Sequence, residues 1–111
     1  MKKFLLVKVN LDPTIGAEIN KTRPCLVISP EEMNNVLRTV IIAPLTSTPP
    51  RTLPTRILIR PSEMNRLTND SYAVLDQIKT VDKRRIHEII GDISDEEKVA
   101  VTETLLELFS Y

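Results

Sequence analysis

Short aliphatic runs separated by prolines and polar turns constrain the fold of this chain more than any other feature. The runs are rich in β-branched residues, which favour strands, and proline can begin a strand but cannot donate to the middle of a ladder. These runs predict strands over residues 3–11, 25–29, 37–43, 55–60, 71–78 and 86–93. No helical segment separates the early strands, so the pattern does not favour a βαβ architecture.

The connections between these strands are polar. Residues 30–35 are expected as a polar connector, residues 61–67 as a stretch with one helical turn, and residues 80–85 as a short charged turn. Pro44 is expected to stop the third strand. The connection over residues 45–54 is rich in hydroxyls and prolines, and a loop of that length in a small domain is more often functional than not.

A capping box marks the one long helix that the sequence predicts. Ser94 stands at the N-cap and Glu97 at N3, so each side chain can accept from the other residue's backbone N–H. Apolar residues follow at mostly helical spacing, which predicts a helix from about Asp95 to Leu108. Many short strands, prolines at the corners and this terminal helix predict a mainly β fold, a small and strongly bent barrel with a C-terminal α-helix.

Length and composition bound the remaining possibilities. The chain of 111 residues predicts one domain over residues 1–111, and 41% apolar residues allow a modest core of the kind that oligomerisation often stabilises. The single Cys25 rules out an intrachain disulfide and fits a reducing cytosol. The N-terminal apolar run is too short for a signal segment and no run approaches membrane-spanning length, so a cytoplasmic protein is expected.

Charge is balanced over the whole chain but not along it. The net charge is zero, yet residues 1–60 carry nine Lys and Arg against four Asp and Glu, whereas residues 61–111 carry six against eleven. The basic excess runs through the loops of the first half. Such a patch could meet phosphates, but a mixed surface explains the charges equally well.

The stretch from Leu11 to Ser29 holds the strongest candidate for a working centre. Pro13 and Gly16 are turn formers in a polar loop, and Arg23 lies where this loop becomes an apolar strand. Other kinds of site have less support, because one His and one Cys do not make a metal centre and two glycines leave no phosphate-binding loop. No cofactor is expected.

Polar residues at strand ends remain as a candidate shared site. They are Glu18, Lys21 and Arg23 at the first corner, Thr46, Ser47 and Thr48 after the third strand, and Asp76 and Gln77 in the fifth. Ordinary structural roles are also open: Arg23 could pair with a surface carboxylate, and Asp76 with Lys79 or Arg84. A nucleophilic pair of Cys25 with His87 is possible on composition, but Cys25 lies in an apolar run where cysteines are usually inert.

Three motifs, in order along the chain, resemble those of the MazF/PemK (Kid) family, the mRNA interferase toxins of type II toxin–antitoxin systems. The first covers residues 12–18 (DPTIGAE), 21–24 (KTRP) and 27–29 (VIS), the second residues 43–47 (APLTS), and the third residues 74–86 (VLDQIKTVDKRRI). Ile90, Gly91 and the capped helix close the pattern. The motifs span nearly the whole chain, and together they are specific where one alone would be weak.

The resemblance implies a sequence-specific endoribonuclease that cuts single-stranded RNA without a metal. It also implies an SH3-like barrel of CcdB/PemK type, a homodimer, and a cognate antitoxin protein as partner. The family's catalytic arginine and threonine fall on Arg23 and Thr46, and the acidic residue of its third motif falls on Asp76. Substrate-binding roles are expected for Gly16, Glu18, Lys21, Ser47, Thr48, Asp76 and Gln77.

Metal-free RNA cleavage accounts for these residue types. The substrate's own 2′-hydroxyl attacks the adjacent phosphate, which requires a proton acceptor, a proton donor and positive charge against the phosphorane. A guanidinium matches phosphate oxygens through a bidentate fork, so Arg23 suits the charge and Thr46 can donate to a non-bridging oxygen. Glu18 and Asp76 are both candidates for the proton acceptor.

Two rival functions stay open at this point. One is a non-catalytic module in the same barrel that poisons a protein target, as the related CcdB-type toxins act on gyrase. The other is an inactive relative that only binds RNA or the antitoxin. The chain departs from the family pattern in two places. Phe4, Leu5 and Lys8 stand where the family usually has Gly-Asp and an aromatic residue, and Val74 stands where some members have an arginine, which bears on the acid–base role of Asp76. The absence of Trp also removes one common base-stacking platform.

Overall fold

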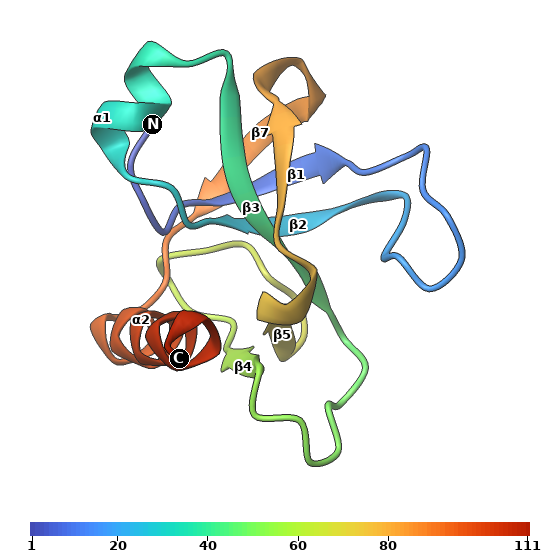
Figure 1. Ribbon diagram of the computed structural model, residues 1–111, viewed down its shortest axis with the longest axis vertical. Coiled ribbons are helices and arrows are strands. Elements are labelled where there is room, and N and C mark those ends of the chain that lie inside the picture. Colours follow the sequence, from blue (N-terminus) through green and yellow to red (C-terminus); the bar gives the residue numbers. More distant parts are fainter.

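The computed structural model describes all 111 residues, and its strands form one strongly bent antiparallel sheet (Figure 1). Six strands follow one another across the sheet in the order β4-β5-β3-β2-β1-β7, and β6 pairs with β3 beside this path. The strands are β1 Leu6–Asn10, β2 Thr22–Val27, β3 Thr39–Thr46, β4 Arg56–Ile59, β5 Ser71–Val74, β6 Lys79–Asp82 and β7 Ile86–Gly91. The predicted fold class, mainly β with a C-terminal helix, is confirmed.

Two α-helices accompany the sheet. α2 (Asp95–Phe109) packs against β4, and α1 (Glu31–Val36) lies against β3 (Figure 1). The predicted capping box is present, because Glu97 N donates to Ser94 Oγ at 3.1 Å and Ser94 N donates to Glu97 Oε1 at 2.9 Å. Neither helix combines the length and the apolar character that crossing a bilayer requires.

β3 is the strand at which the sheet bends. Its first half pairs with β6 and its last residues, Leu45 and Thr46, pair with β5, while β2 lies along its other edge. The prediction that Pro44 stops this strand is wrong, because Pro44 is buried within β3, opposite Cys25 of β2. Pro44 falls between the residues paired with β6 and those paired with β5, so its missing N–H breaks no ladder bond on that edge.

Two segments near the first half of the chain also differ from the predictions. β2 begins at Thr22 rather than at residue 25, and Pro24 within it lies opposite Lys8 of β1. β3 pairs with β2 only from Cys25 onward, so Pro24 lies where one edge of β2 has no partner strand. The polar connector expected over residues 30–35 is largely α1, where two glutamates in the first turn favour the positive end of the helix dipole.

The predicted strand over residues 71–78 is interrupted. β5 ends at Val74, a 3-10 turn follows over Leu75–Gln77, and β6 then occupies part of the segment expected as a charged turn. Only Val81 of the four β6 residues is buried. A strand with a single buried side chain carries no apolar run, so periodicity could not detect it.

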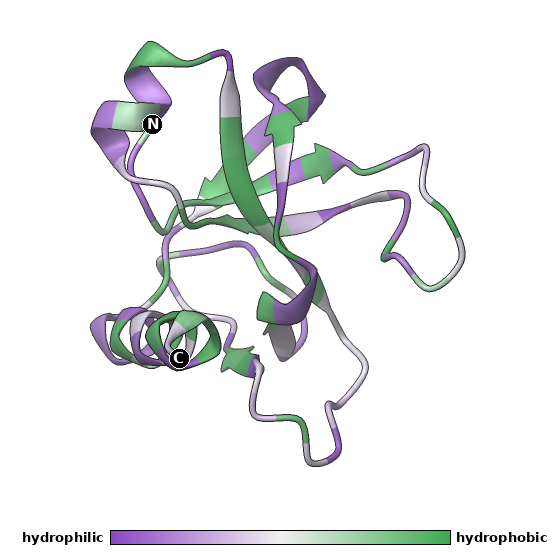
Figure 2. Cartoon of the chain, in the orientation of Figure 1, coloured by the Kyte–Doolittle hydropathy of each residue, from purple (hydrophilic) through white to green (hydrophobic).

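The sheet buries a hydrophobic core on each of its faces, because side chains along a strand alternate. The core that includes Val101 of α2 also contains Leu6, Leu26, Ala43, Leu45, Ile59, Ala73, Leu75, Ile90 and Ile93. The core on the other face contains Val7, Val9, Leu11, Cys25, Val27, Val40, Ile42 and Val81. The central strands are accordingly mostly green in Figure 2. Functional side chains on these strands must therefore lie near their ends.

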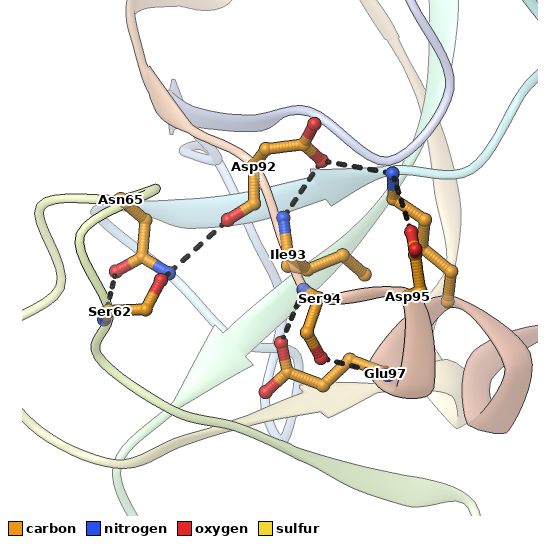
Figure 3. Close-up of polar contacts among 8 residues, drawn as sticks. Ser62, Asn65, Asp92, Ile93, Ser94, Asp95 and Glu97 are labelled. Atoms are coloured by element: carbon orange, nitrogen blue, oxygen red, sulfur yellow. Dashed lines mark hydrogen bonds and ion pairs between the residues drawn. The ribbon is translucent and has the colours of Figure 1, made fainter.

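A polar network ties the connection between β4 and β5 to the segment before α2 (Figure 3). The Asn65 amide is 9% exposed and donates through Nδ2 to the carbonyl oxygens of Arg60 and Asp92, at 3.2 Å each. Its Oδ1 accepts from the backbone N–H of Leu67 at 3.1 Å. Each buried polar atom of this side chain has a partner, so the network holds the connection in one conformation.

Candidate active site

Arg23 and Thr46, the two residues predicted to be catalytic, come from neighbouring ends of β2 and β3. The pairing of these two strands extends as far as Cys25 opposite Pro44, and each predicted residue lies two positions beyond that pair. Both residues line one cavity of about 370 Å³, and Ser47 lines it as well. The structure therefore brings these three predicted residues together.

The Arg23 guanidinium is free to bind an anion. Arg23 is half-buried, and its Nε donates to the carbonyl oxygen of Asn20 at 2.7 Å. Its two terminal amino groups make no hydrogen bond within the protein, and no carboxylate lies within 4.0 Å of it. The alternative role of Arg23, an ion pair with a surface carboxylate, is therefore not formed. A half-buried fork with unused donors suits a phosphate.

A second cavity, of about 400 Å³, is lined in part by the loop between β1 and β2. Its lining residues are Ile15, Ala17, Glu18, Ile19, Pro44, Asp76, Gln77, Ile78 and Lys79. The predicted residues Glu18, Asp76 and Gln77 therefore share this second cavity, whereas Arg23 and Thr46 line only the first.

The remaining predicted residues, Gly16, Lys21 and Thr48, line neither cavity. Gly16 and Lys21 have φ angles of +57° and +68°, so they shape the loop between β1 and β2 rather than contribute side chains to a cavity wall. The backbone N–H of Thr48 donates to Thr46 Oγ1 at 3.3 Å. Thr48 thus fixes the hydroxyl of its neighbour.

Gln77 holds the loop between β1 and β2 against the sheet. Its Oε1 accepts from the backbone N–H of Ile19 at 2.8 Å, and its Nε2 donates to the carbonyl oxygen of Ala17 at 3.4 Å. The Glu18 carboxylate between these two residues accepts from the backbone N–H of Ile15 at 2.6 Å. The two hydrogen bonds of Gln77 therefore fix the backbone on either side of Glu18.

Asp76 is engaged with a residue that the sequence did not indicate. Its carboxylate accepts from Arg56 Nη2 at 3.3 Å and from Thr55 Oγ1 at 3.0 Å, rather than from Lys79 or Arg84. Burial raises the pKa of Asp76, but the hydrogen bonds from Arg56 and Thr55 outweigh this effect and leave the pKa below its usual range. Asp76 is therefore ionised at neutral pH.

Replacing Asp76 with asparagine should remove a pH-dependent part of the stability. Folding lowers the pKa of this carboxyl, so its stabilisation is present above the unfolded value of about 3.9 and is lost as the pH falls through the folded value. We expect Asp76→Asn to melt at a lower temperature than wild type at neutral pH, and the gap to close below about pH 4. Thermal unfolding across this range checks it, and a gap independent of pH would contradict it.

The thiol of Cys25 is unsuited to nucleophilic chemistry. Burial raises its pKa to about 12, against the opposing influence of the Arg23 guanidinium and the Lys79 ammonium, so the thiol is protonated at neutral pH. His87 is exposed on β7, which β1 separates from β2. The Cys25–His87 pair considered from composition is therefore not formed.

Three charged residues in the first cavity escaped the sequence analysis: Lys8 of β1, Glu88 of β7, and Arg66 of the connection between β4 and β5. Lys8 Nζ lies 3.3 Å from Glu88 Oε1, and Arg66 Nη2 lies 3.3 Å from Glu88 Oε2. The hydrogen bond from Lys8 and the charge of Arg66 lower the pKa of Glu88. The only sequence signal for these three residues was that Lys8 interrupts an apolar run. Nothing in the sequence shows that β1, β7 and the connection between β4 and β5 come together.

A match to a family model identifies the class of protein that has this fold and this site. Residues 2–109 match the family model described as PemK-like, MazF-like toxin of type II toxin-antitoxin system. The chain belongs to this family, and the resemblance found in its motifs is confirmed.

Individual relatives agree with this assignment. The chain is 34% identical over 97 residues to "Endoribonuclease EndoA" of Bacillus subtilis, which covers 86% of this chain and 83% of that protein. MazF from Deinococcus radiodurans superposes with a TM-score of 0.82 at 25% identity, over 97% of this chain and 94% of that one. Mycobacterium tuberculosis toxin MazF-mt6 does so with a TM-score of 0.78 at 25% identity, over 95% of each chain.

Proposed function

We propose that this protein is a sequence-specific, metal-independent endoribonuclease that cleaves single-stranded RNA in the cytoplasm as the toxin of a toxin–antitoxin pair. The observation that carries the proposal is the Arg23 guanidinium, whose terminal donors are unused and which lines the same cavity as Thr46. The name of the EndoA relative, an endoribonuclease, supports the reaction class.

The proposed reaction is an internal transesterification. The 2′-oxygen of one nucleotide forms a bond to the adjacent phosphorus, and the bond from that phosphorus to the 5′-oxygen of the next nucleotide breaks. The products are a 2′,3′-cyclic phosphate and a free 5′-hydroxyl, with one proton leaving the 2′-oxygen and one reaching the 5′-oxygen. Arg23 would stabilise the charge on the phosphorane through two parallel hydrogen bonds, and Thr46 Oγ would donate to a non-bridging oxygen.

Glu18 is the better of the two candidates for the proton acceptor. The Asp76 carboxylate is held by Arg56 and Thr55, whereas Glu18 Oε1 accepts one backbone N–H and its second oxygen has no hydrogen-bond partner in the protein. Glu18 lies on an exposed loop, so a small movement of that loop could bring it to the 2′-hydroxyl. Asp76 and Gln77 would then hold the RNA and the loop in place.

The partners proposed here follow from the family and from the charge of the chain. A type II toxin has a protein antitoxin, and we expect an acidic segment of it to cover the basic loops of the first half of the chain. The structure "Endoribonuclease in complex with its cognate antitoxin from Mycobacterial species" superposes over 100% of this chain and 98% of that one, with a TM-score of 0.80 at 21% identity. A homodimer remains the prediction that the resemblance to the family implies.

The purified protein is expected to cut a long single-stranded RNA in the presence of EDTA. Cleavage should leave 5′-hydroxyl ends, because the 2′-oxygen and not water attacks the phosphorus, and an RNA with 2′-O-methyl groups should stay intact. Mapping the 5′ ends of the fragments gives the cut sequence. Intact RNA after incubation with a folded protein would contradict the proposal, and inhibition of gyrase by such a protein would favour the CcdB-like alternative.

A further inference from the structure

Besides Arg23, the first cavity is lined by two cations that share one carboxylate. Lys8 and Glu88 face each other across the pair of β1 and β7, and Arg66 reaches the second oxygen of Glu88. Arg66 Nη2 also donates to the carbonyl oxygen of Ile89 at 3.0 Å. The two cations are therefore held at fixed places on the cavity wall without being neutralised in full.

The charged residues of this cavity leave a net positive charge that can attract an anion. Lys8, Arg23 and Arg66 line it together with one carboxylate, Glu88, so its net charge is +2. The side chains of Lys8, Arg66 and Glu88 are 47%, 64% and 43% exposed. Ion pairs at such exposure contribute little to stability, so both cations can exchange the carboxylate for a phosphate at small cost.

The rest of the cavity suits the sugar and the base of a nucleotide. Its volume of about 370 Å³ lies within the range of small-molecule sites. Leu45, Leu67 and Ile90 line it with apolar side chains. Hydroxyl or amide groups come from Ser47, Thr68, Asn69 and Ser71. An apolar surface beside hydroxyl and amide groups can contact a base face and hydrogen-bond its edge.

The wall that carries Arg66 is rigid before any ligand arrives. The backbone N–H of Arg66 donates to the carbonyl oxygen of Ile90 at 3.0 Å, and that of Leu67 donates to Asn65 Oδ1 at 3.1 Å. Asn65 is itself fixed to Asp92 (Figure 3). A preorganised wall loses little entropy on binding, which distinguishes a built subsite from a chance gathering of charges.

We propose that this cavity is a nucleotide subsite next to the scissile phosphate, in which Lys8 and Arg66 bind a neighbouring phosphodiester of the RNA. The inference rests on the proposed function and deepens it. An acidic peptide could meet the same cations, but a concave cavity with apolar contacts, continuous with Arg23 and Thr46, fits one nucleotide of a bound strand better than an extended carboxylate-rich chain. Glu88 weakens non-specific binding by occupying both cations until the RNA displaces it.

Binding and cleavage are measured separately to test the subsite. The probe for binding is a random pool of 2′-O-methyl RNA oligonucleotides, which the enzyme cannot cleave. Arg66→Ala should weaken binding about tenfold and reduce the slope of log affinity against log salt by about 0.7, the value for one lost phosphate contact on a single strand. Glu88→Gln should have the opposite effect, with tighter binding and a steeper slope. In the cleavage assay Arg66→Ala should raise KM and leave kcat unchanged.

The matched control is Arg84→Ala, which also removes an arginine paired with a carboxylate but lies outside this cavity. It should bind the pool as wild type does. Equal affinity and salt slope for Arg66→Ala and Arg84→Ala would overturn the subsite while leaving RNA cleavage intact. Polyglutamate serves as a second probe, for an acidic protein segment. If Arg66→Ala lost binding to polyglutamate but bound the RNA pool as wild type does, the subsite would also be overturned, in favour of an acidic protein segment. A wild type that binds the pool with the expected slope but cuts no RNA would reject the proposed function and leave the subsite standing.

Discussion

Replacing Arg23 with alanine is expected to lower the rate of RNA cleavage by about a thousandfold. The guanidinium is the group placed to meet charge that develops on the phosphorane, because the other two cations of this cavity, Lys8 and Arg66, are paired with Glu88 and Arg23 is not paired with a carboxylate. An interaction that strengthens in the transition state affects kcat rather than KM. Single-turnover cleavage of a mapped RNA site, together with binding of the uncleavable pool, separates these two effects.

The controls for this prediction are chosen from the same residue type. Arg23→Lys keeps the charge but loses the planar fork, so it should recover only part of the activity. Arg84→Ala, in an exposed ion pair with Asp82, should cut RNA at the wild-type rate. The side chain of Arg23 makes one hydrogen bond, to the carbonyl oxygen of Asn20, so its loss should leave the melting temperature nearly unchanged. A well-folded Arg23→Ala protein that retains wild-type kcat would remove Arg23 from the catalytic step.

Local signals predicted those parts of the fold that depend on neighbouring residues. The capping box placed the start of α2 correctly, since Ser94 and Glu97 need only each other. The errors arose where a third element decides the structure. Pro44 continues a strand because β5 and β6 divide one edge of β3 between them, and β6 forms because β3 supplies its partner. Neither fact is visible within a window of the sequence.

The motifs indicate one part of the site, and the fold alone brings the residues of the other part together. Arg23 and Thr46 were selected from their motifs, and the pairing of β2 with β3 brings the ends of the two strands to one cavity. Lys8, Arg66 and Glu88 belong to no motif and come from three separate segments. Pairing of β1 with β7 and the network around Asn65 bring them together, so tertiary structure was required to find them.

Gly91→Ala is expected to lower the free energy of unfolding by about 3 kcal/mol and the melting temperature by about 10 °C. Gly91 has a φ angle of +142°, which an L side chain rarely adopts. A Cβ there would stand 2.2 Å from the carbonyl oxygen of Met64 and 2.4 Å from the Cα of Asn65. Both atoms belong to the backbone and cannot rotate away, so the connection between β4 and β5 would have to move.

Gly16→Ala separates the two causes of the expected loss of stability, which are the positive φ angle and the contact with the backbone of Met64 and Asn65. Gly16 also has a positive φ, +57°, but no atom lies within 4 Å of a Cβ built there, so its replacement should cost only about 1 kcal/mol. Thermal or urea unfolding of the two variants measures the difference, and equal melting temperatures would show that the contact with Met64 does not matter. The displaced connection carries Arg66, so folded Gly91→Ala should bind RNA more weakly while Arg23 still supports the wild-type kcat. Loss of kcat at unchanged affinity would instead mean that the β4–β5 connection positions the reacting phosphate itself.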